Sequence, residues 1–347
     1  MIFIESRLEN FRNFKRLKID WSERINLILG SNGSGKTNLL ESLSILSGWG
    51  GFSRTKNLIN WNNSLQLASI FAKISGEEDF TVAAQIASRI SLKLENKKIS
   101  CTELRELLPS VIFLTGAINL IDATSAARRL FIDKLCALIH SPYAKILADF
   151  KAVNRYRINL LRAKRPTNST TELFCKTGGY IMERRRKVIS MLQEFLNNSE
   201  KTFTIKIIPD LKNLSGADFL YNSLKIHHER EILAMRPLSG VNFDDIVFMV
   251  NDKPASDVLS RGQKRMLVLN LIINAGKLIY SRLKRKPVLF FDDLTAELDT
   301  NARETALKNL LDTGWQIFLT APENPFLGGK KYNSDLVSCL NINSLKA

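Results

Sequence analysis

The run Gly30–Thr37 constrains the fold of this chain more than any other feature, because it reads G-x-x-x-x-G-K-T. The apolar segment Ile25–Leu29 precedes it, and leucines at positions 39, 40, 43 and 46 follow it at helical spacing. A glycine-rich turn between a strand and a helix lets backbone N–H groups close around a phosphate at the helix N-terminus. The run therefore predicts a nucleotide-binding α/β fold. A chance glycine-rich turn is disfavoured because both flanking elements are in place.

The residues of this run have distinct predicted roles, with ATP and Mg²⁺ as the expected ligands. Lys36 would reach the β- and γ-phosphate oxygens and take part in catalysis, and the Thr37 hydroxyl would bind Mg²⁺. The predicted nucleotide-binding residues are Gly30, Ser31, Asn32, Gly33, Ser34, Gly35, Lys36, Thr37 and Asn38.

An acidic pair follows a second apolar run nearer the C-terminus. Val288–Phe291 is apolar throughout, as is typical of a strand buried on both faces of a sheet, and Asp292 and Asp293 come directly after it. Asp292 would hold Mg²⁺, directly or through water, and Asp293 would accept a proton from the attacking water. The alternative, a solvated acidic turn, is disfavoured by the separate phosphate-binding run.

A third motif precedes another helical pattern. Leu259–Gln263 reads L-S-R-G-Q and resembles the LSGGQ signature of ABC-type ATPases. A serine hydroxyl and a glycine-backed helix N-terminus present hydrogen-bond donors to a phosphate. Ser260, Gly262 and Gln263 would therefore contact the γ-phosphate of ATP bound by a second subunit. In the run A-E-L-D that follows the acidic pair, Asp299 has the spacing of the ABC D-loop.

In a site of this kind ATP lies between two heads, so ATP binding closes a homodimer and hydrolysis releases it. Ordinary ABC-type ATPases carry Glu after the Mg²⁺-binding aspartate, and Asp293 is one methylene shorter. We therefore expect slow turnover, as in a switch rather than a motor. A scaffold that binds ATP and barely hydrolyses it is the non-enzymatic alternative.

The chain is strongly basic, with 50 Lys and Arg against 34 Asp and Glu and a net charge of +16. A polyanionic partner, nucleic acid or an anionic membrane, is the first expectation for such a charge. The charge is concentrated between Arg128 and Lys187, where 15 basic and 4 acidic residues give +11. Solvated helix faces are the alternative to a DNA-binding surface. The predicted DNA-binding residues are Arg128, Arg129, Arg155, Arg157, Arg162, Lys164, Arg165, Arg184, Arg185, Arg186 and Lys187.

The expected elements are α/β, then helical, then α/β. Residues 125–164 carry apolar side chains at helical spacing with a boundary at Ser141–Pro142, and a helix over 171–197 is expected to kink at Gly178–Gly179. We predict an α/β ABC-type ATPase head, with a mixed sheet around the phosphate-binding run and an antiparallel β meander, and an inserted helical, basic lobe. The expected ranges are 1–115 and 239–347 for the two parts of the head and 116–238 for the lobe.

Membrane and secreted classes are disfavoured. No stretch approaches the roughly 20 apolar residues of a membrane helix, and the first five residues carry no basic leader before an apolar run. The four cysteines form no Cys-x-x-Cys pair, which argues against a structural zinc site and a disulfide framework. We expect a cytoplasmic protein with no membrane partner.

Several segments resemble the RecF family. Leu8–Phe14 and Ile25–Glu41 look like the opening of the RecF/SMC group of ATPases. Gly51–Thr55, Ala127–Asp133 and Tyr156–Arg162 are similar to segments of RecF proteins, whereas SMC proteins insert long coiled coils that this chain lacks. The chain is identified on these segments as a divergent member of the RecF family.

Two segments depart from the family pattern. Gly240–Asp245 keeps only the ends of the family's Gly-Pro-His-Arg-Asp-Asp element. Thr115–Ala117 replaces the Pro-Glu or Pro-Asp expected after the strand at 111–114, so no Q-loop ligand is assigned. These departures keep open a second interpretation, an SMC-like ATPase that regulates a partner nuclease in phage defence.

The resemblance implies an ATPase of DNA replication and recombinational repair, associated with the nucleoid. It implies binding to gapped or junction DNA by an ATP-dependent dimer, and joint action with RecR and RecO to place RecA on single-strand gaps. It also implies that Arg12 contacts the nucleotide, with a plain surface arginine as the alternative.

Overall fold

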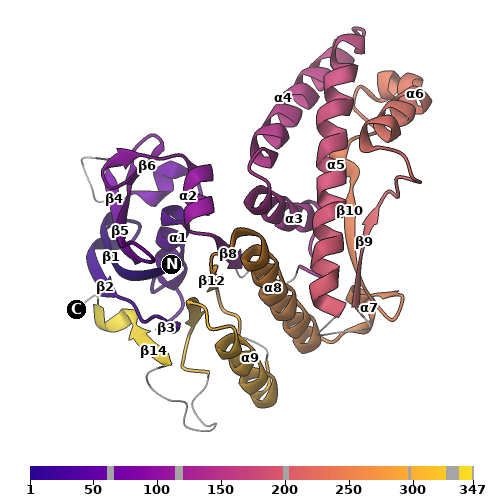
Figure 1. The fold of residues 1–347 in the computed structure, drawn as a ribbon. Coiled ribbons are helices and arrows are strands. Elements are labelled where there is room, and N and C mark those ends of the chain that lie inside the picture. The colour runs from indigo at the N-terminus through magenta and orange to yellow at the C-terminus, as the bar shows by residue number, and fades with distance from the viewer. Residues whose placement is uncertain (61–65, 114–119, 198–202, 296–297, 326–335, 346–347) are drawn as a thin grey trace. The chain divides into compact units, whose positions relative to one another are not determined.

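The chain forms two compact units in a computed structural model, which describes residues 1–60, 66–113, 120–197, 203–295, 298–325 and 336–345. The first unit, called the head below, comprises Met1–Asn119 and Ser260–Ala347. The second, called the lobe, comprises Leu120–Leu259 (Figure 1). The lobe is therefore an insertion between two parts of the head.

A five-stranded parallel sheet forms one layer of the head, in the order β14-β3-β13-β12-β8. Its central strands β12 and β13 are buried at every residue, as their apolar sequences predict. All its strands point the same way, so the segments that follow them meet at one edge. The strands are β3 (Ile25–Leu29), β8 (Ser110–Phe113), β12 (Val288–Phe291), β13 (Ile317–Ala321) and β14 (Val337–Asn341).

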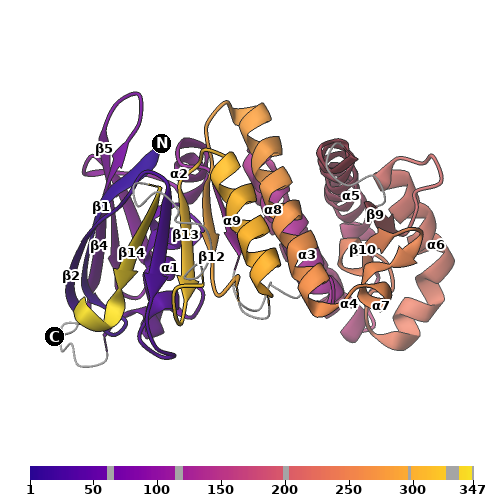
Figure 2. The ribbon, with the colours of Figure 1, turned by 90° about the horizontal axis from the view of Figure 1, so that it is seen from below.

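Helices of the head flank this sheet, and α8 and α9 lie side by side (Figure 2). Short 3₁₀ turns also lie between some of these elements in the described part of the head. The helices are α1 (Lys36–Leu46), α2 (Cys101–Leu107), α8 (Arg261–Leu283) and α9 (Thr300–Asp312), with the 3₁₀ turns η1 (Thr55–Leu58) and η4 (Ile342–Leu345).

An antiparallel sheet forms the second layer of the head, in the order β2-β1-β4-β5-β6-β7. Buried residues alternate with more accessible, mostly half-buried ones along β4, as expected for a sheet with one face on the core. The strands are β1 (Ile2–Phe11), β2 (Phe14–Asp20), β4 (Ala68–Ser75), β5 (Phe80–Ile86), β6 (Ile90–Leu94) and β7 (Lys97–Lys98).

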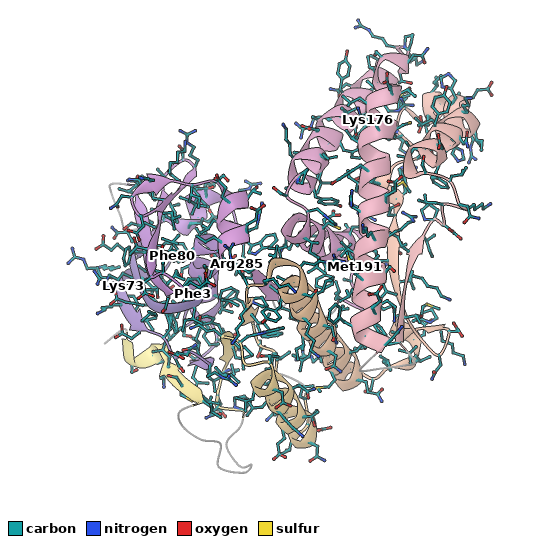
Figure 3. The ribbon with its side chains drawn as sticks, in the orientation of Figure 1. Phe3, Lys73, Phe80, Lys176, Met191 and Arg285 are labelled. Carbon is teal, nitrogen blue, oxygen red and sulfur yellow. The ribbon has the colours of Figure 1, made fainter. Side chains whose placement is uncertain are left out.

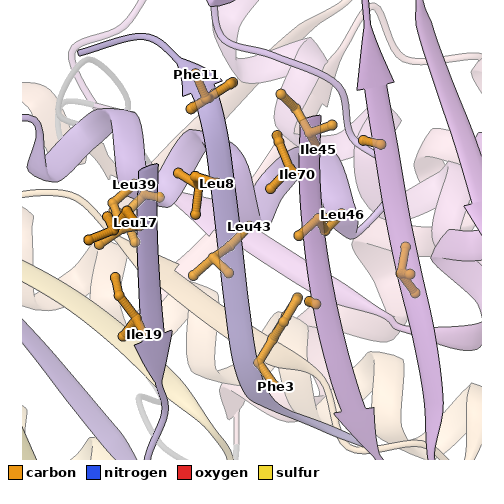
Figure 4. Packing of buried hydrophobic residues seen from close by; sticks show 14 of the residues in the cluster. Phe3, Leu8, Phe11, Leu17, Ile19, Leu39, Leu43, Ile45, Leu46 and Ile70 are labelled. Carbon is orange, nitrogen blue, oxygen red and sulfur yellow. The ribbon is translucent and has the colours of Figure 1, made fainter. Parts of the chain in front are cut away.

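The core of the head lies between these two sheets and α1 (Figure 4). The ring of Phe3 on β1 lies 6.3 Å from that of Phe290 on β12 and 5.9 Å from that of Phe318 on β13. The buried side chain of Gln316 accepts a hydrogen bond from the Phe3 amide (2.7 Å) and donates to the Phe3 carbonyl (2.8 Å). Apolar contacts and one buried amide therefore join the two sheets.

The lobe combines helices with a small sheet in the order β11-β10-β9. Its long helices α4 and α5 pack against each other. The elements are α3 (Ser125–Ile139), α4 (Tyr143–Arg162), α5 (Asn168–Asn197), β9 (Phe203–Ile208), α6 (Gly216–Ala234), η3 (Val241–Phe243), β10 (Asp245–Val250), β11 (Lys253–Pro254) and α7 (Ala255–Val258).

The predicted α/β head with an inserted lobe is confirmed, but the sheets, the content of the lobe and both of its boundaries differ in part from the expectation. The sheet around the phosphate-binding run is parallel rather than mixed, and the predicted antiparallel meander is present as β4-β5-β6 in a separate sheet. The lobe contains strands, because β10 pairs with β9 from Asp245 to Val250. That pairing places residues 239–259 in the lobe, so the second division lies at 259/260 rather than 238/239. The first lies at 119/120 instead of 115/116, and residues 114–119 are outside the described ranges.

Among the described residues, α8 is the one helix long and apolar enough, by length and composition, to cross a membrane. The core helix of a globular domain meets the same criterion, and most of α8 from Leu267 to Ile279 is buried. A Cβ added to Gly276 would lie 2.3 Å from the Trp315 ring, so this helix packs tightly against the rest of the head.

The paired glycines of α5 permit a close helix contact instead of the expected kink. The helix runs uninterrupted from Asn168 to Asn197, and Lys176 and Met191, labelled in Figure 3, lie on either side of the glycines. A Cβ on Gly179 would lie 2.3 Å from the backbone nitrogen of Ala217 in α6. Only glycine allows the two backbones to approach so closely.

We expect Gly179→Ala to lower the free energy of unfolding of the lobe by about 2–3 kcal/mol, because the added methyl group overlaps backbone atoms of α6. Urea unfolding followed by circular dichroism measures this. Ser190→Ala, on the exposed face of the same helix, is the control and should change the free energy of unfolding by no more than ~0.5 kcal/mol. Equal stability of the two variants would contradict the close contact.

Candidate nucleotide-binding site

Three segments meet at the carboxyl edge of the parallel sheet. Thr37 lies in the first turn of α1 after β3, Asp292 follows β12, and Thr320 lies near the end of β13. The Thr37 hydroxyl lies 3.0 and 3.1 Å from the two carboxylate oxygens of Asp292, and the Thr320 hydroxyl donates to the same carboxylate (2.7 Å). Asp292 is almost fully buried, so these hydroxyls hold its carboxylate in one orientation.

The phosphate-binding run has the backbone shape that its sequence predicts. Gly33 and Gly35 have φ angles of 79° and 108°, which residues with a side chain rarely adopt. The Lys36 ammonium folds back over the turn and donates to the carbonyls of Gly30 (2.6 Å) and Ser31 (3.0 Å). Burial lowers the pKa of Lys36, while the charges of Asp293 and Asp292 act in the opposite direction.

These residues surround a cavity of about 390 Å³. Carboxylate and hydroxyl oxygens of Asp292 and Thr37 are the ligand type that Mg²⁺ prefers. The Lys36 ammonium and the N-terminus of α1 suit phosphate oxygens. The donor set therefore fits a magnesium-bound phosphate chain. The cavity is lined by Asn32, Gly33, Gly35, Lys36, Thr37, Asn38, Asp292, Asp293, Thr320 and Pro322.

Asp293 lies in the left-handed backbone region, with a φ of 56°. Its amide donates to the Thr320 hydroxyl (2.9 Å), which also holds Asp292. Aspartate adopts this region more readily than most residues with a side chain. Its position on the cavity wall suits the proton acceptor that the sequence predicts.

Asn13, in the turn between β1 and β2, is a site residue that motif reasoning missed. Its Nδ2 donates to the Ser34 carbonyl (3.0 Å), and its Oδ1 accepts from Asn38 (2.8 Å). A Cβ on Gly35 would lie 2.5 Å from Asn13, so the asparagine also explains why this position needs glycine. The only sequence signal was its place in the family-like run Leu8–Phe14, because no phosphate-binding pattern extends so far upstream.

Arg12 is held away from the cavity lining. Its guanidinium donates to Glu41 of α1 (2.7 Å) and to Ser53 (2.6 Å). Glu41 is buried and also accepts from the Phe52 amide. The structure thus shows Arg12 joining α1 to the segment that follows it, and a nucleotide contact remains a prediction.

The signature forms the start of α8. Ser260 is the N-cap, its hydroxyl accepts from the Gln263 amide (3.3 Å), and its own amide donates to the Gln263 side chain (2.9 Å). Ser260 and Gln263 are exposed and Gly262 is half-buried. None of the three lines the cavity beside Lys36. A single chain therefore does not bring the signature to its own phosphate-binding turn.

Asp299 caps α9, accepting a hydrogen bond from the Ala302 amide (2.8 Å). This contact accounts for the aspartate as a helix cap. The predicted D-loop role is not tested by it, and the first two residues of that run, 296 and 297, lie outside the described part of the chain.

Two of the predicted DNA-binding arginines are buried in the lobe. Arg157 is 1% exposed and pairs with Glu231 (2.9 Å). Arg185 is 2% exposed and pairs with Asp133 (2.8 Å) and Asp244 (2.7 Å). The prediction is wrong for both, because each guanidinium neutralises a carboxylate inside the lobe and cannot reach a phosphate.

Partly buried members of the same set have partners within the lobe. Arg128 bonds to the Asp245 carboxylate, Arg129 to the Asp244 carbonyl (2.5 Å), and Arg186 to the carbonyls of Met182 and Pro209. Arg184 lies over the ring of Tyr180, 4.9 Å from its centroid. The exposed members are Arg155, Arg162, Lys164, Arg165 and Lys187.

A larger cavity of about 900 Å³ lies in the lobe between α5 and α6. Its lining includes Glu172, Tyr180, Asp218 and Tyr221, and contains none of the predicted site residues. Chemistry rather than size therefore identifies the smaller cavity in the head as the nucleotide site.

Comparison with known proteins matches residues 4–337 to the RecF/RecN/SMC N-terminal domain family. The DNA replication and repair protein RecF of Shewanella oneidensis is 28% identical over 333 residues, covering 93% of this chain and 92% of the relative. RecF of Bacillus cytotoxicus is 28% identical over 349 residues, covering 92% and 91%.

Solved structures show the same fold. The recombination mediator protein RecF-ATPrS in the RecFOR pathway superposes with a TM-score of 0.83 at 23% identity, covering 97% of each chain. An Smc head bound to the C-terminal winged-helix domain of ScpA superposes with a TM-score of 0.53 at 16% identity, covering 94% of this chain and 90% of the other.

We expect Asn13→Ala to weaken Mg-ATP binding about tenfold, because two hydrogen bonds that hold the phosphate-binding turn are lost, at a cost of ~1.4 kcal/mol. Isothermal titration calorimetry measures the affinity. Asn57→Ala, an exposed asparagine of η1, is the matched control and should bind ATP like the unmodified protein. Unchanged affinity in Asn13→Ala would remove this residue from the site.

Proposed function

Because this chain belongs to the RecF/RecN/SMC family, and within it to the RecF proteins, we propose that it is a DNA-binding ATPase of replication and recombinational repair. The observation that carries the proposal is the Thr37–Asp292–Thr320 arrangement beside Lys36, which is built to hold a magnesium-bound triphosphate. ATP is the nucleotide, with Mg²⁺ as its cofactor.

The site acts between two heads. The cavity of about 390 Å³ is near the small end for ligand sites, and the exposed signature Ser260 lies outside its lining. A second chain is therefore required to cover the γ-phosphate. ATP binding pairs two heads, and hydrolysis separates them.

Hydrolysis depends on groups with distinct tasks. Thr37 and Asp292 would hold Mg²⁺, which would supply positive charge to neutralise the phosphates. Lys36 leaves the carbonyls of the turn and binds phosphate oxygens instead. Asp293 orients the attacking water and takes its proton, and turnover is slow because its side chain is shorter than the usual glutamate.

DNA binds to the basic lobe. Arg162, Lys164 and Arg165 are exposed together at the end of α4, where their charge is free to meet phosphates. Pairing of two heads brings two lobes onto one DNA molecule as a clamp. The substrate is a gap or a junction between single- and double-stranded DNA.

The partners are RecR and RecO, with which the protein places RecA on single-strand gaps. A structurally similar protein, RecF-ATPrS, is a recombination mediator in the RecFOR pathway. That similarity supports RecR and RecO as the proposed partners of this chain. The reaction takes place in the cytoplasm on the nucleoid.

Replacing Asp293 by Asn should lower the ATPase rate about 100-fold or more, because the proton acceptor is lost, while ATP affinity and ATP-dependent dimerisation persist. A phosphate-release assay and analytical ultracentrifugation measure these quantities. Asp312→Asn, an exposed aspartate at the end of α9, is the control and should be unaffected.

The same assay separates the alternatives. A wild-type rate in Asp293→Asn removes Asp293 from the reaction. A background rate in the wild type, combined with ATP-dependent dimerisation, identifies a nucleotide-dependent scaffold instead of an ATPase.

Changing Arg162, Lys164 and Arg165 together to Glu should weaken binding to gapped DNA on the order of 100-fold, because three phosphate contacts become repulsive. The matched control changes Lys93, Lys97 and Lys98 of the head to Glu, which alters net charge equally and should cost less than about threefold. Fluorescence anisotropy measures both. For the wild type, affinity should fall by ~10³ between roughly 50 and 200 mM salt. Equal losses in the two variants would show that only overall charge matters.

A further inference from the structure

The turn η4 of the head lies beside the phosphate-binding turn because two strands of the parallel sheet end together. β14 pairs in parallel with β3, and its last residue, Asn341, is the partner of Leu29, the last residue of β3. The chains of a parallel pair run the same way. The residues that follow, Gly30 and Ile342, therefore leave the sheet at the same edge, and η4 begins where the phosphate-binding turn begins.

The backbone of η4 is held in place by its neighbours. Ile342 is fully buried and belongs to the core of the head. The Asn341 side chain accepts a hydrogen bond from the Asn343 amide (3.0 Å), and the Asn341 carbonyl accepts one from the Ser344 hydroxyl (2.7 Å). Asn343 itself is exposed, so its backbone is fixed while its side chain is free to rotate.

The surroundings of Gly30 show that the Asn343 side chain reaches the phosphate-binding turn. A Cβ on Gly30 would lie 2.6 Å from the Ser34 hydroxyl oxygen and 3.4 Å from Oδ1 of Asn343. The hydroxyl and the amide oxygen therefore lie on the same side of Gly30. A hydroxyl can donate to an amide oxygen, so the two groups are chemically matched as well as near each other.

The Ser34 hydroxyl is buried without a hydrogen-bond partner among the described residues. The backbone of Ser34 is held on both sides, because its amide donates to the Ser31 carbonyl (3.1 Å) and its carbonyl accepts from Asn13 (3.0 Å). Within the same part of the chain, the side chain of Asn343 makes no hydrogen bond either. An unpaired buried hydroxyl costs free energy, so a bond from Ser34 to Asn343 would be favourable.

Nucleotide binding would change the hydrogen bonds of this turn. The Lys36 ammonium donates to the carbonyls of Gly30 (2.6 Å) and Ser31 (3.0 Å) in the structure. The proposed function moves this ammonium onto phosphate oxygens, which takes two hydrogen bonds away from the turn. A hydrogen bond from Ser34 to Asn343 would replace part of that loss, and it requires only a rotation of an exposed side chain.

We propose that Asn343 is a positioning residue of the nucleotide site, whose Oδ1 accepts a hydrogen bond from the Ser34 hydroxyl when Lys36 moves to the phosphates of ATP. The inference rests on the proposed function, because it requires ATP at this site. Asn343 holds the turn and does not touch the nucleotide. The bond forms only with ATP bound, so it raises the affinity for ATP and adds nothing to the stability of the unliganded protein.

The test compares Asn343→Ala with the unmodified full-length protein. The dissociation constant for Mg-ATP, measured by isothermal titration calorimetry, should rise about fivefold, which corresponds to ~1 kcal/mol. The turnover number at saturating ATP should stay within about twofold, because hydrolysis depends on other groups. The melting temperature without nucleotide should stay within about 1 °C, whereas the rise in melting temperature caused by Mg-ATP should become smaller.

Two further variants sharpen the test. Ser344→Ala is the control, since Ser344 is exposed in the same turn and its hydroxyl donates to the Asn341 carbonyl. It should bind Mg-ATP like the wild type. In a protein that already carries Ser34→Ala, the change Asn343→Ala should weaken binding no further, because the donor has been removed.

Three results would overturn the proposal. The first is a normal affinity for Mg-ATP in Asn343→Ala. The second is a melting temperature that falls equally with and without Mg-ATP, as a merely structural role of η4 requires. The third is an undiminished effect of Asn343→Ala in the Ser34→Ala protein. Failure of the wild type to bind Mg-ATP would instead overturn the proposed function, and the inference with it.

Discussion

The buried carboxylate of Asp292 is the interaction on which the site depends. It accepts hydrogen bonds from Thr37 and Thr320, and its amide donates to Phe113 on the neighbouring strand. One residue thus ties the start of α1, which follows β3, to the ends of strands β8 and β13 at the carboxyl edge of the parallel sheet. A carboxylate this deeply buried requires hydrogen-bond donors. A parallel sheet brings them together because its strands all end at the same edge.

The basic residues of the lobe fall into two groups that the composition does not separate. Arg157 and Arg185 are internal and hold the helices together through carboxylates. The side chains of Arg155, Arg162, Lys164, Arg165 and Lys187 are exposed to solvent instead. Buried guanidinium groups and exposed ones look identical in a count of charges, so about +11 over 128–187 overstates the charge that this segment exposes to solvent.

Sequence reasoning predicted the strand–turn–helix around Lys36, the acidic end of β12 and the helix that begins at the signature, since each depends on neighbours in the chain. It placed residues 239–259 in the head, because the pairing of β10 with β9 joins segments about 40 residues apart. It interpreted Gly178–Gly179 as a kink, because the neighbouring residues carry no signal that α6 packs against α5 at these glycines. It missed Asn13, whose contacts with the phosphate-binding turn cross 21 to 25 residues.

The sequence by itself determined the nucleotide chemistry of this protein. Glycine, lysine and threonine at fixed spacing set the backbone shape and donors of Gly30–Thr37, and an apolar run ending in Asp292 specified a buried strand with a carboxylate at its end. Only the tertiary structure decided which arginines face solvent, where the lobe begins and ends, and that Arg128 meets Asp245 across 117 residues. The physical reason is range: local backbone geometry is encoded by adjacent residues, whereas burial and charge pairing depend on which distant segments pack together.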